Sequence, residues 1–190
     1  MELNVVLYLL LLVLVALERL AELRISRRHQ RALLERGIAK RRDPRFRWMV
    51  LLHTGVLIGA AIEVIALRRP FLPVLGLSMA VLFVLATALR WWAIRSLGTH
   101  WNVEVMDSGS LGVVSRGPYR WVRHPNYLAV FVEMAAVPLI HTAWITALVG
   151  TVANAWILRH RIAMEESLLE SHPGYRAAMA AKPRFLPKPF

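Results

Sequence analysis

The chain has 190 residues, a formal net charge of +12 and a mean hydropathy of +0.46, and 57% of its residues are hydrophobic. This length fits one domain, and the hydropathy is high for a soluble protein. Because the chain contains no cysteine, disulfides, thiolate catalysis and cysteine-based zinc sites are excluded, and we predict no metal site of another kind.

Three apolar stretches in the first half of the chain are each long enough to cross a membrane as a helix. They are residues 3–17, 48–67 and 71–92, and the first reaches this length if its helix extends by a turn towards Leu20. A spanning helix needs about 20 predominantly apolar residues, because the hydrocarbon core is about 30 Å thick. The first helix is expected to continue beyond the membrane as an amphipathic extension past Arg28, with Gly37 as its stop.

The fourth apolar stretch, Tyr127 to Leu158, is too long for a single span. As one helix it would be about 48 Å long at 1.5 Å per residue. Pro138 and the polar pair His141 and Thr142 lie near its middle. Two short helices in a hairpin are the preferred interpretation and give five membrane helices, whereas one kinked, strongly tilted helix would give four. The sequence therefore predicts an all-α integral membrane protein of about five helices with a C-terminal hairpin.

Basic residues are distributed unevenly between these helices. Of the 24 lysines and arginines, 22 fall in three groups, at residues 19–47, 90–123 and 159–188, and the other two are Arg68 and Arg69. With five helices the three groups share one side, which the positive-inside rule makes cytoplasmic. We therefore expect a protein of the cell (inner) membrane with its N-terminus outside and its C-terminus inside. The charge would meet anionic lipid head groups rather than nucleic acid.

The chain divides into three parts within one domain, residues 1–190. Residues 1–92 carry the three N-terminal helices, residues 93–126 form a cytoplasmic loop, and residues 127–190 hold the hairpin, a cofactor-binding helix and a tail. In the loop, residues 101–105 and 111–114 are candidates for short extended pieces. A loop of this length is uncommon in a small membrane protein unless it has a function.

That loop ends in the stretch around which the chain is organised, Gly117 to Phe131. His124 precedes a proline, which disfavours the helical conformation for it, and Pro125 suits the first turn of a helix. The expected structure is a loop that closes onto a helix N-terminus, where free N–H groups can hold a carboxylate or phosphate. An interfacial anchor of Arg, His, Trp and Tyr side chains is the alternative at this position.

Several ionisable residues lie in or beside the apolar stretches. Glu18 and Glu22 share a helix face near Arg19, and a solvated face is the preferred interpretation for them. His53 and Glu63 are intramembrane ionisable groups and are therefore functional candidates, although either could simply satisfy a neighbouring helix.

Arg161 and Glu165 are four residues apart on the last long helix and so lie on one face. One interpretation is a surface ion pair of little energetic weight. The other is that this face packs beside the His124 loop at the membrane boundary. In the second case, two distant polar segments would form one pocket.

These segments together resemble the isoprenylcysteine carboxyl methyltransferase (ICMT) family, whose members are integral-membrane enzymes that use S-adenosylmethionine. The resemblance rests on Gly117-Pro118-Tyr119, on Arg123-His124-Pro125-Asn126-Tyr127, and on Arg161 with Glu165-Glu166 after a helical hairpin. The chain also resembles a bacterial branch that methylates alkylpyrones or alkylresorcinols, through residues 18–23, Leu97-Gly98, Trp101-Asn102 and the surroundings of Glu133. One position departs from many members, which have glycine where this chain has Ala129.

The resemblance implies roles for individual residues. Arg161 would face the methyl acceptor and, with His124, is the catalytic candidate. Glu165 would bind a polar group of the cofactor, and Glu166 would support it. The residues implied in S-adenosylmethionine binding are Leu111, Gly112, Val113, Val114, Tyr119, Arg123, His124, Pro125, Asn126, Tyr127, Glu165 and Glu166.

The expected function is methyl transfer to an oxygen of a lipophilic acceptor, either a prenylcysteine-like carboxylate or an alkylpyrone- or alkylresorcinol-like phenol or enol. A carboxylate acceptor needs only orientation, for which Arg161 is suited, whereas a phenol or enol also needs a group to take its proton. His124 or a glutamate would be that group. A phospholipid N-methyltransferase and a non-enzymatic membrane scaffold are the alternatives, and the sequence leaves the acceptor and the oligomeric state open.

Overall fold

The structure, a computed structural model, describes residues 2–41, 43–107 and 111–187. Within these residues the fold is all-α, as predicted, and no strand is formed. The long helices are α1 (Leu3–Leu34), α2 (Phe46–Ala66), α3 (Pro73–Leu97), α4 (Pro125–Leu139) and α5 (Trp144–Leu169). Short helical segments follow α3 and precede α4, namely η1 (Gly98–His100) and η3 (Gly117–Arg120), and α6 (Pro173–Met179) follows α5.

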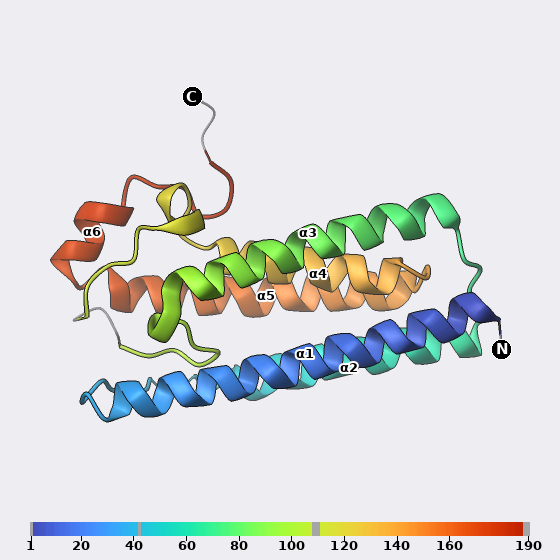
Figure 1. The fold of residues 1–190 in the computed structure, drawn as a ribbon, viewed down its shortest axis with the longest axis horizontal. Helices are drawn as coiled ribbons and strands as arrows, with labels where there is room; N and C mark the ends of the chain where they lie inside the picture. Colours follow the sequence, from blue (N-terminus) through green and yellow to red (C-terminus); the bar gives the residue numbers. More distant parts are fainter. Residues whose placement is uncertain (1, 42, 108–110, 188–190) are drawn as a thin grey trace.

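The long helices run roughly parallel to one axis and form two groups (Figure 1). Helices α1 and α2 lie side by side, and α3, α4 and α5 form the second group, within which α3 packs closely on α4. Helix α5 also contacts α2 and thereby joins the groups. The segment after α3, η3, α6 and the described part of the C-terminal tail gather at one end of the bundle, which we call the loop end (Figure 1).

Three helices, α1, α2 and α3, are long and apolar enough to cross a membrane, and α4 is a shorter apolar helix of 15 residues. Many of their large apolar side chains face outward, among them Leu14 (63% exposed) and Val84 (62%). Exposed apolar side chains of this density suit contact with lipid rather than with water. The protein is therefore a helical membrane protein.

Residues 127–158 form two helices rather than one, which confirms the predicted hairpin. Helix α4 ends at Leu139, just after Pro138, and α5 begins at Trp144. Thr142 in the turn has a positive φ of 55°. The carboxylate of Glu63 on α2 accepts hydrogen bonds from the main-chain N–H groups of Ile145 (3.1 Å) and Thr146 (2.8 Å). Glu63 is therefore a structural residue that satisfies the N-terminus of α5.

Helix α1 runs unbroken from Leu3 to Leu34, so the predicted extension beyond residue 20 is confirmed. Gly37, with a φ of +75°, lies in the turn that ends it. The extension holds the loop after α3: the Ser26 hydroxyl accepts the N–H of Val103 (2.9 Å), and His29 Nδ1 donates to the carbonyl of Trp101 (2.8 Å).

The predicted extended pieces at residues 101–105 and 111–114 are wrong as strands. The described part of this region contains a single isolated bridge, in which Lys40 pairs with Met106. The segment instead docks by individual hydrogen bonds onto α1 and onto residues 39–41, such as the one from the N–H of Arg41 to the carbonyl of Val105 (3.0 Å). An edge strand would require a longer partner than residues 39–41 supply.

Candidate active site

A cavity of about 510 Å³ opens inside the loop end and extends between the helices. Its polar half is lined by the loop segments, the start of α4 and the last turns of α5. Its mainly apolar half is lined by α1 and α2, through side chains such as Leu20, Leu23, Met49, Leu57 and Ile58, although Arg19, Glu22 and His53 of these helices also line it. A volume of 300–1,000 Å³ is typical of small-molecule sites. The two halves form one continuous space, so a polar group and an apolar chain can meet within it.

Segment η3 carries Tyr119 into the wall of this cavity. Gly117 begins the segment with a φ of +59°, and a Cβ at this position would overlap the side chain of Ser96 on α3. Glycine is thus required at position 117 for two reasons, the backbone conformation and the close approach of α3. Burial and the charge of Glu165 raise the pKa of the Tyr119 hydroxyl well above its usual value. The hydroxyl is therefore a neutral donor.

His124 is the N-cap residue of α4, with φ −127° and ψ 53°, and Pro125 occupies the first turn, as predicted. The main-chain N–H groups before the helix are not free, however. The N–H of Arg123 donates to the carbonyl of Pro183 (2.9 Å), and that of His124 donates to the carbonyl of Arg184 (2.8 Å). The tail therefore occupies the main-chain donors of the two residues before the helix, whereas those of the first turn of α4 stay predicted anion donors.

The imidazole of His124 is fixed by Glu166. Its Nε2 donates to Glu166 Oε1 (3.0 Å), and both side chains are buried. The same carboxylate also pairs with Arg123 (3.1 Å) and with Arg184 (2.6 Å). Burial raises the pKa of Glu166, but the hydrogen bonds from Arg184 and His124 and the charge of Arg123 outweigh it and lower this pKa below its usual value. Glu166 is therefore ionised and joins α5, the loop and the tail.

Glu165 points to the cavity from the next position on α5. Its carboxylate accepts the hydroxyl of Tyr127 (2.6 Å). Tyr175 of α6 also lines the cavity, and burial together with the charge of Glu165 raises its pKa to about 12. Glu165 is thus an anionic group at the polar end of the cavity, surrounded by neutral phenols.

Arg161 is buried, so its interpretation as part of a surface ion pair with Glu165 is wrong. Its Nη1 donates to Asp43 (2.8 Å), a residue of the α1–α2 connection, and its Nη2 donates to the carbonyl of Val103 (2.6 Å). The second interpretation is confirmed, because the face of α5 that carries Arg161 and Glu165 packs beside the His124 loop. Arg161 also lines the cavity.

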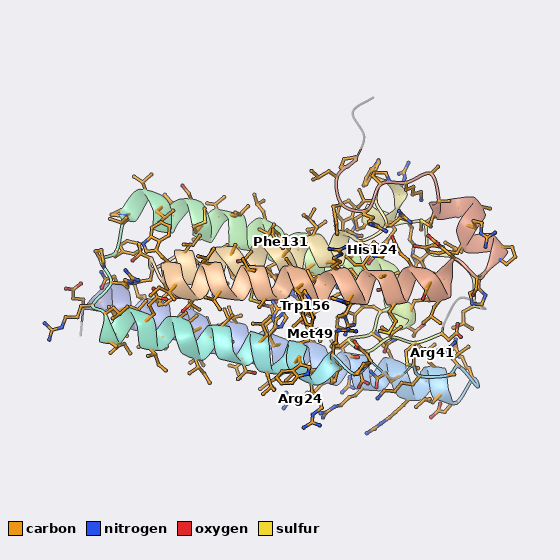
Figure 2. All side chains as sticks on the ribbon, turned by 180° about the vertical axis from the view of Figure 1, so that it is seen from behind. Arg24, Arg41, Met49, His124, Phe131 and Trp156 are labelled. Atoms are coloured by element: carbon orange, nitrogen blue, oxygen red, sulfur yellow. The ribbon has the colours of Figure 1, made fainter. Side chains whose placement is uncertain are left out.

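Most of the predicted site residues line this one cavity. They are Gly112, Val113, Val114, Tyr119, Arg123, His124, Asn126, Tyr127, Arg161 and Glu165. Leu111, Pro125 and Glu166 lie outside its lining, and Glu166 reaches the site through His124. Figure 2 shows His124 at the loop end beside α5.

The cavity also fits the polar groups of S-adenosylmethionine, which carries a carboxylate, an ammonium group, ribose hydroxyls and an adenine. Buried polar atoms without a partner among the described residues include Asn126 Oδ1, Arg123 Nε and Asn102 Oδ1, and all three residues line the cavity. Buried polar atoms normally have hydrogen-bond partners. A polar ligand would satisfy these atoms, while Glu165 would attract its ammonium group or ribose hydroxyls.

A second polar cluster was misjudged from the sequence. Glu22 is not on a solvated face but only 2% exposed, and Arg90 of α3 donates to both of its oxygens (2.5 Å each). Arg19 also pairs with Glu22 (3.0 Å) and with Glu133 of α4 (3.2 Å). The sequence contained one indication of this cluster: Arg90 and Glu133 lie in apolar stretches, and charged residues there need partners of opposite charge.

The fold and the cavity define a helical membrane protein with a cavity at one end of its bundle. Residues 79–171, which run from within α3 to the end of α5, match the sequence model of the isoprenylcysteine carboxyl methyltransferase (ICMT) family. A solved structure of a eukaryotic intramembrane Ras methyltransferase, ICMT, is similar with a TM-score of 0.55 and 26% sequence identity over 68% of this chain. This chain spans about half the length of that protein, 48%. The fold is therefore an ICMT-like membrane fold.

Two bacterial proteins are similar over most of the chain. The uncharacterized protein YpbQ of Bacillus subtilis is 27% identical over 164 residues, which cover 86% of this chain and 96% of YpbQ. An uncharacterized protein of Haemophilus influenzae is 29% identical over 152 residues, which cover 80% of this chain and 88% of that protein. Both similarities extend well beyond residues 79–171.

Proposed function

We propose that this protein is an S-adenosylmethionine-dependent O-methyltransferase that acts on a lipophilic acceptor in the cell membrane. The observation that carries this proposal is the convergence of His124, Glu165 and Arg161 on one cavity with a polar and an apolar half. The match of residues 79–171 to the ICMT family supports it.

In this proposal the polar half holds the cofactor. Glu165 binds the ammonium group or the ribose hydroxyls of the cofactor. The buried, unpartnered polar atoms of Asn126 and Arg123 form hydrogen bonds with it, and Tyr119 and Tyr175 line the cavity beside it. When bound, S-adenosylmethionine supplies an electrophilic methyl group on a sulfonium. Glu166 positions His124 and does not touch the ligand.

The apolar half holds the tail of the acceptor, and its oxygen is presented near Arg161. A carboxylate and a phenol or enol are both candidate acceptors, of prenylcysteine-like and of alkylpyrone- or alkylresorcinol-like molecules. The positive charge of Arg161 is already matched by Asp43 at 2.8 Å, which favours a neutral acceptor with an O–H group over a carboxylate.

Calorimetric titration of the detergent-solubilised protein with S-adenosylmethionine tests the cofactor. Binding is expected for the wild type and should be weakened at least tenfold by Glu165→Ala and by His124→Ala. A membrane scaffold would bind no cofactor at all. Mass spectrometry of lipid extracts from cells with and without the gene then identifies the acceptor as the species that gains one methyl group.

The orientation is a separate proposal, based on the basic residues at the loop end. We place the loop end and the C-terminus in the cytoplasm and the N-terminus outside. A reporter fused after the last residue should be active in the cytoplasm, and activity on the outside of the membrane would reverse the assignment.

A further inference from the structure

His53 of α2 lines the apolar half of the cavity, where an acceptor would lie under the proposed function. The face of α2 toward the cavity consists of Met49, Val50, His53, Thr54, Leu57 and Ile58. His53 is at the centre of this otherwise mainly apolar face, with apolar neighbours one turn away on each side. An ionisable group at membrane depth that faces a cavity is a candidate functional group.

The tautomer of His53 is determined by its own helix. Nδ1 lies 2.8 Å from the main-chain carbonyl of Met49, and a carbonyl oxygen can only accept, so Nδ1 carries the proton. In the neutral ring Nε2 is then unprotonated and can accept a hydrogen bond. Nδ1 makes the one hydrogen bond of this ring within the described residues, so Nε2 has no partner there.

Two other histidines line the cavity, His100 of η1 and His124 before α4. Nε2 of His124 is already bonded to Glu166 at the polar end, where we place the cofactor. His53 lines the cavity from α2, and its Nε2 makes no hydrogen bond within the described residues.

Charged groups of both signs lie near His53. Arg90 and Arg19 oppose a positive charge on its ring, whereas Glu22 favours one. Glu22 and Glu133 pair with the two arginines. Glu18 also pairs with Arg19, so this cluster holds three carboxylates and two guanidinium groups. The other charged or titratable groups that line the cavity are His100, Glu104, Arg123, His124, Arg161, Glu165, Tyr119, Tyr127 and Tyr175.

From this geometry we infer that His53 accepts a hydrogen bond from the hydroxyl of the acceptor through Nε2 and removes its proton during methyl transfer. The acceptor oxygen gains the methyl group, the electron pair of the former methyl–sulfur bond stays on sulfur, and the proton moves to Nε2. The positive charge of the sulfonium thus ends on the imidazolium of His53, near the carboxylate of Glu22. This inference rests on the proposed function.

The test compares binding of para-dodecylphenol with binding of its methyl ether, para-dodecylanisole, in the absence of a methyl donor. Both probes have the same tail, and only the phenol can donate a hydrogen bond. Binding is measured from the rise of the unfolding temperature in detergent with probe concentration. The wild type should prefer the phenol by about three- to tenfold, the effect of one net hydrogen bond.

Two variants separate the hydrogen bond from the proton transfer. His53→Phe keeps a ring but has no acceptor, so it should lose the phenol preference and also methyl transfer. His53→Gln keeps an acceptor oxygen, so it should retain the preference while methyl transfer falls by about 10² to 10⁴. His160→Phe is the matched control, because His160 makes the same contact to a carbonyl four residues earlier (2.8 Å, Trp156) but does not line the cavity.

An unchanged phenol preference in His53→Phe, or unchanged methyl transfer in His53→Gln, would overturn the inference. Failure of the proposed function looks different: the wild type would bind no S-adenosylmethionine and transfer no methyl group, whatever its preference for the phenol. A phenol preference that depends on His53 in such a protein would leave the hydrogen bond standing and reject the proton transfer.

Discussion

His124 and Glu166 form a buried pair that links the start of α4 to the end of α5, with Nε2 and Oε1 3.0 Å apart. Arg184 of the tail holds the other oxygen of Glu166 at 2.6 Å, and the main chain of the tail accepts the N–H groups of Arg123 and His124. The orientation of His124 therefore depends on a residue 42 positions later and on the tail beyond it.

Glu166→Gln should weaken binding of S-adenosylmethionine, although Glu166 does not line the cavity. The variant keeps the side chain's shape and removes the charge that holds His124, Arg123 and Arg184. Hydrogen bonds to charged groups contribute about 1.5–3 kcal/mol, so a decrease in affinity of about tenfold or more is expected in a calorimetric titration. Glu170→Gln is the control, because Glu170 is more exposed and contacts Arg123 only at 3.5 Å. Equal affinities in the two variants would contradict this role.

The same carboxylate gives a pH dependence with a defined sign. The pKa of Glu166 is lower in the folded protein than in the unfolded chain, where it is about 4.3. Its contribution to stability is therefore complete above that value and is lost as the pH falls through the lower folded pKa. The difference in unfolding temperature between the wild type and Glu166→Gln should be constant near neutral pH and shrink in acid. If the difference between the two unfolding temperatures grew on acidification, the pKa of Glu166 would be raised in the folded protein, which would contradict this prediction.

Removal of the tail from Lys182 onward should impair the site without unfolding the helices. The truncation deprives the N–H groups of Arg123 and His124 of their acceptors and Glu166 of Arg184. Affinity for S-adenosylmethionine should fall by about tenfold, while far-UV circular dichroism changes little. Leu186→Ala serves as a control, because that side chain is 69% exposed. Unchanged affinity after truncation would show that the tail does not order the site.

Gly117→Ala should destabilise the protein more than Gly112→Ala. Both glycines have a positive φ, +59° and +94°, so both substitutions introduce backbone strain. Only at position 117 does the added methyl group overlap another side chain, that of Ser96, whereas nothing lies within 4 Å of it at position 112. The difference between the two unfolding temperatures measures the close approach of η3 to α3. Equal effects would mean that η3 can move away from α3 without cost.

Glu22→Gln should cost about 3–5 kcal/mol of stability, because among the described residues it leaves the buried Arg90 with a carboxylate contact only to Glu133, at 3.4 Å. Thermal unfolding in detergent measures this effect. Glu18→Gln is a milder comparison, since Glu18 is at the edge of the cluster with 18% of its side chain exposed. A larger loss of stability for Glu18→Gln than for Glu22→Gln would contradict the central role of Glu22 in this charge cluster.

The sequence by itself determined the helices and their approximate ends, because the length and composition of an apolar stretch are local properties. Pro138 together with His141 and Thr142 indicated the hairpin, and Pro125 indicated the start of α4. The motif residues around His124 and Glu165 indicated a shared site through their resemblance to a family, since spacing along a chain does not measure distance across a fold.

Only the tertiary structure decided which charged groups are paired. Glu22 has a polar, basic sequence neighbourhood, and its burial depends on Arg90, 68 positions away. Likewise, Arg161 has Glu165 one helical turn away, yet its partner is Asp43, which approaches from the α1–α2 connection. The contacts of the tail with the His124 segment and the position of His53 in the cavity also result from tertiary packing. Ion pairs and cavities arise from helix packing, which joins residues that no local pattern relates.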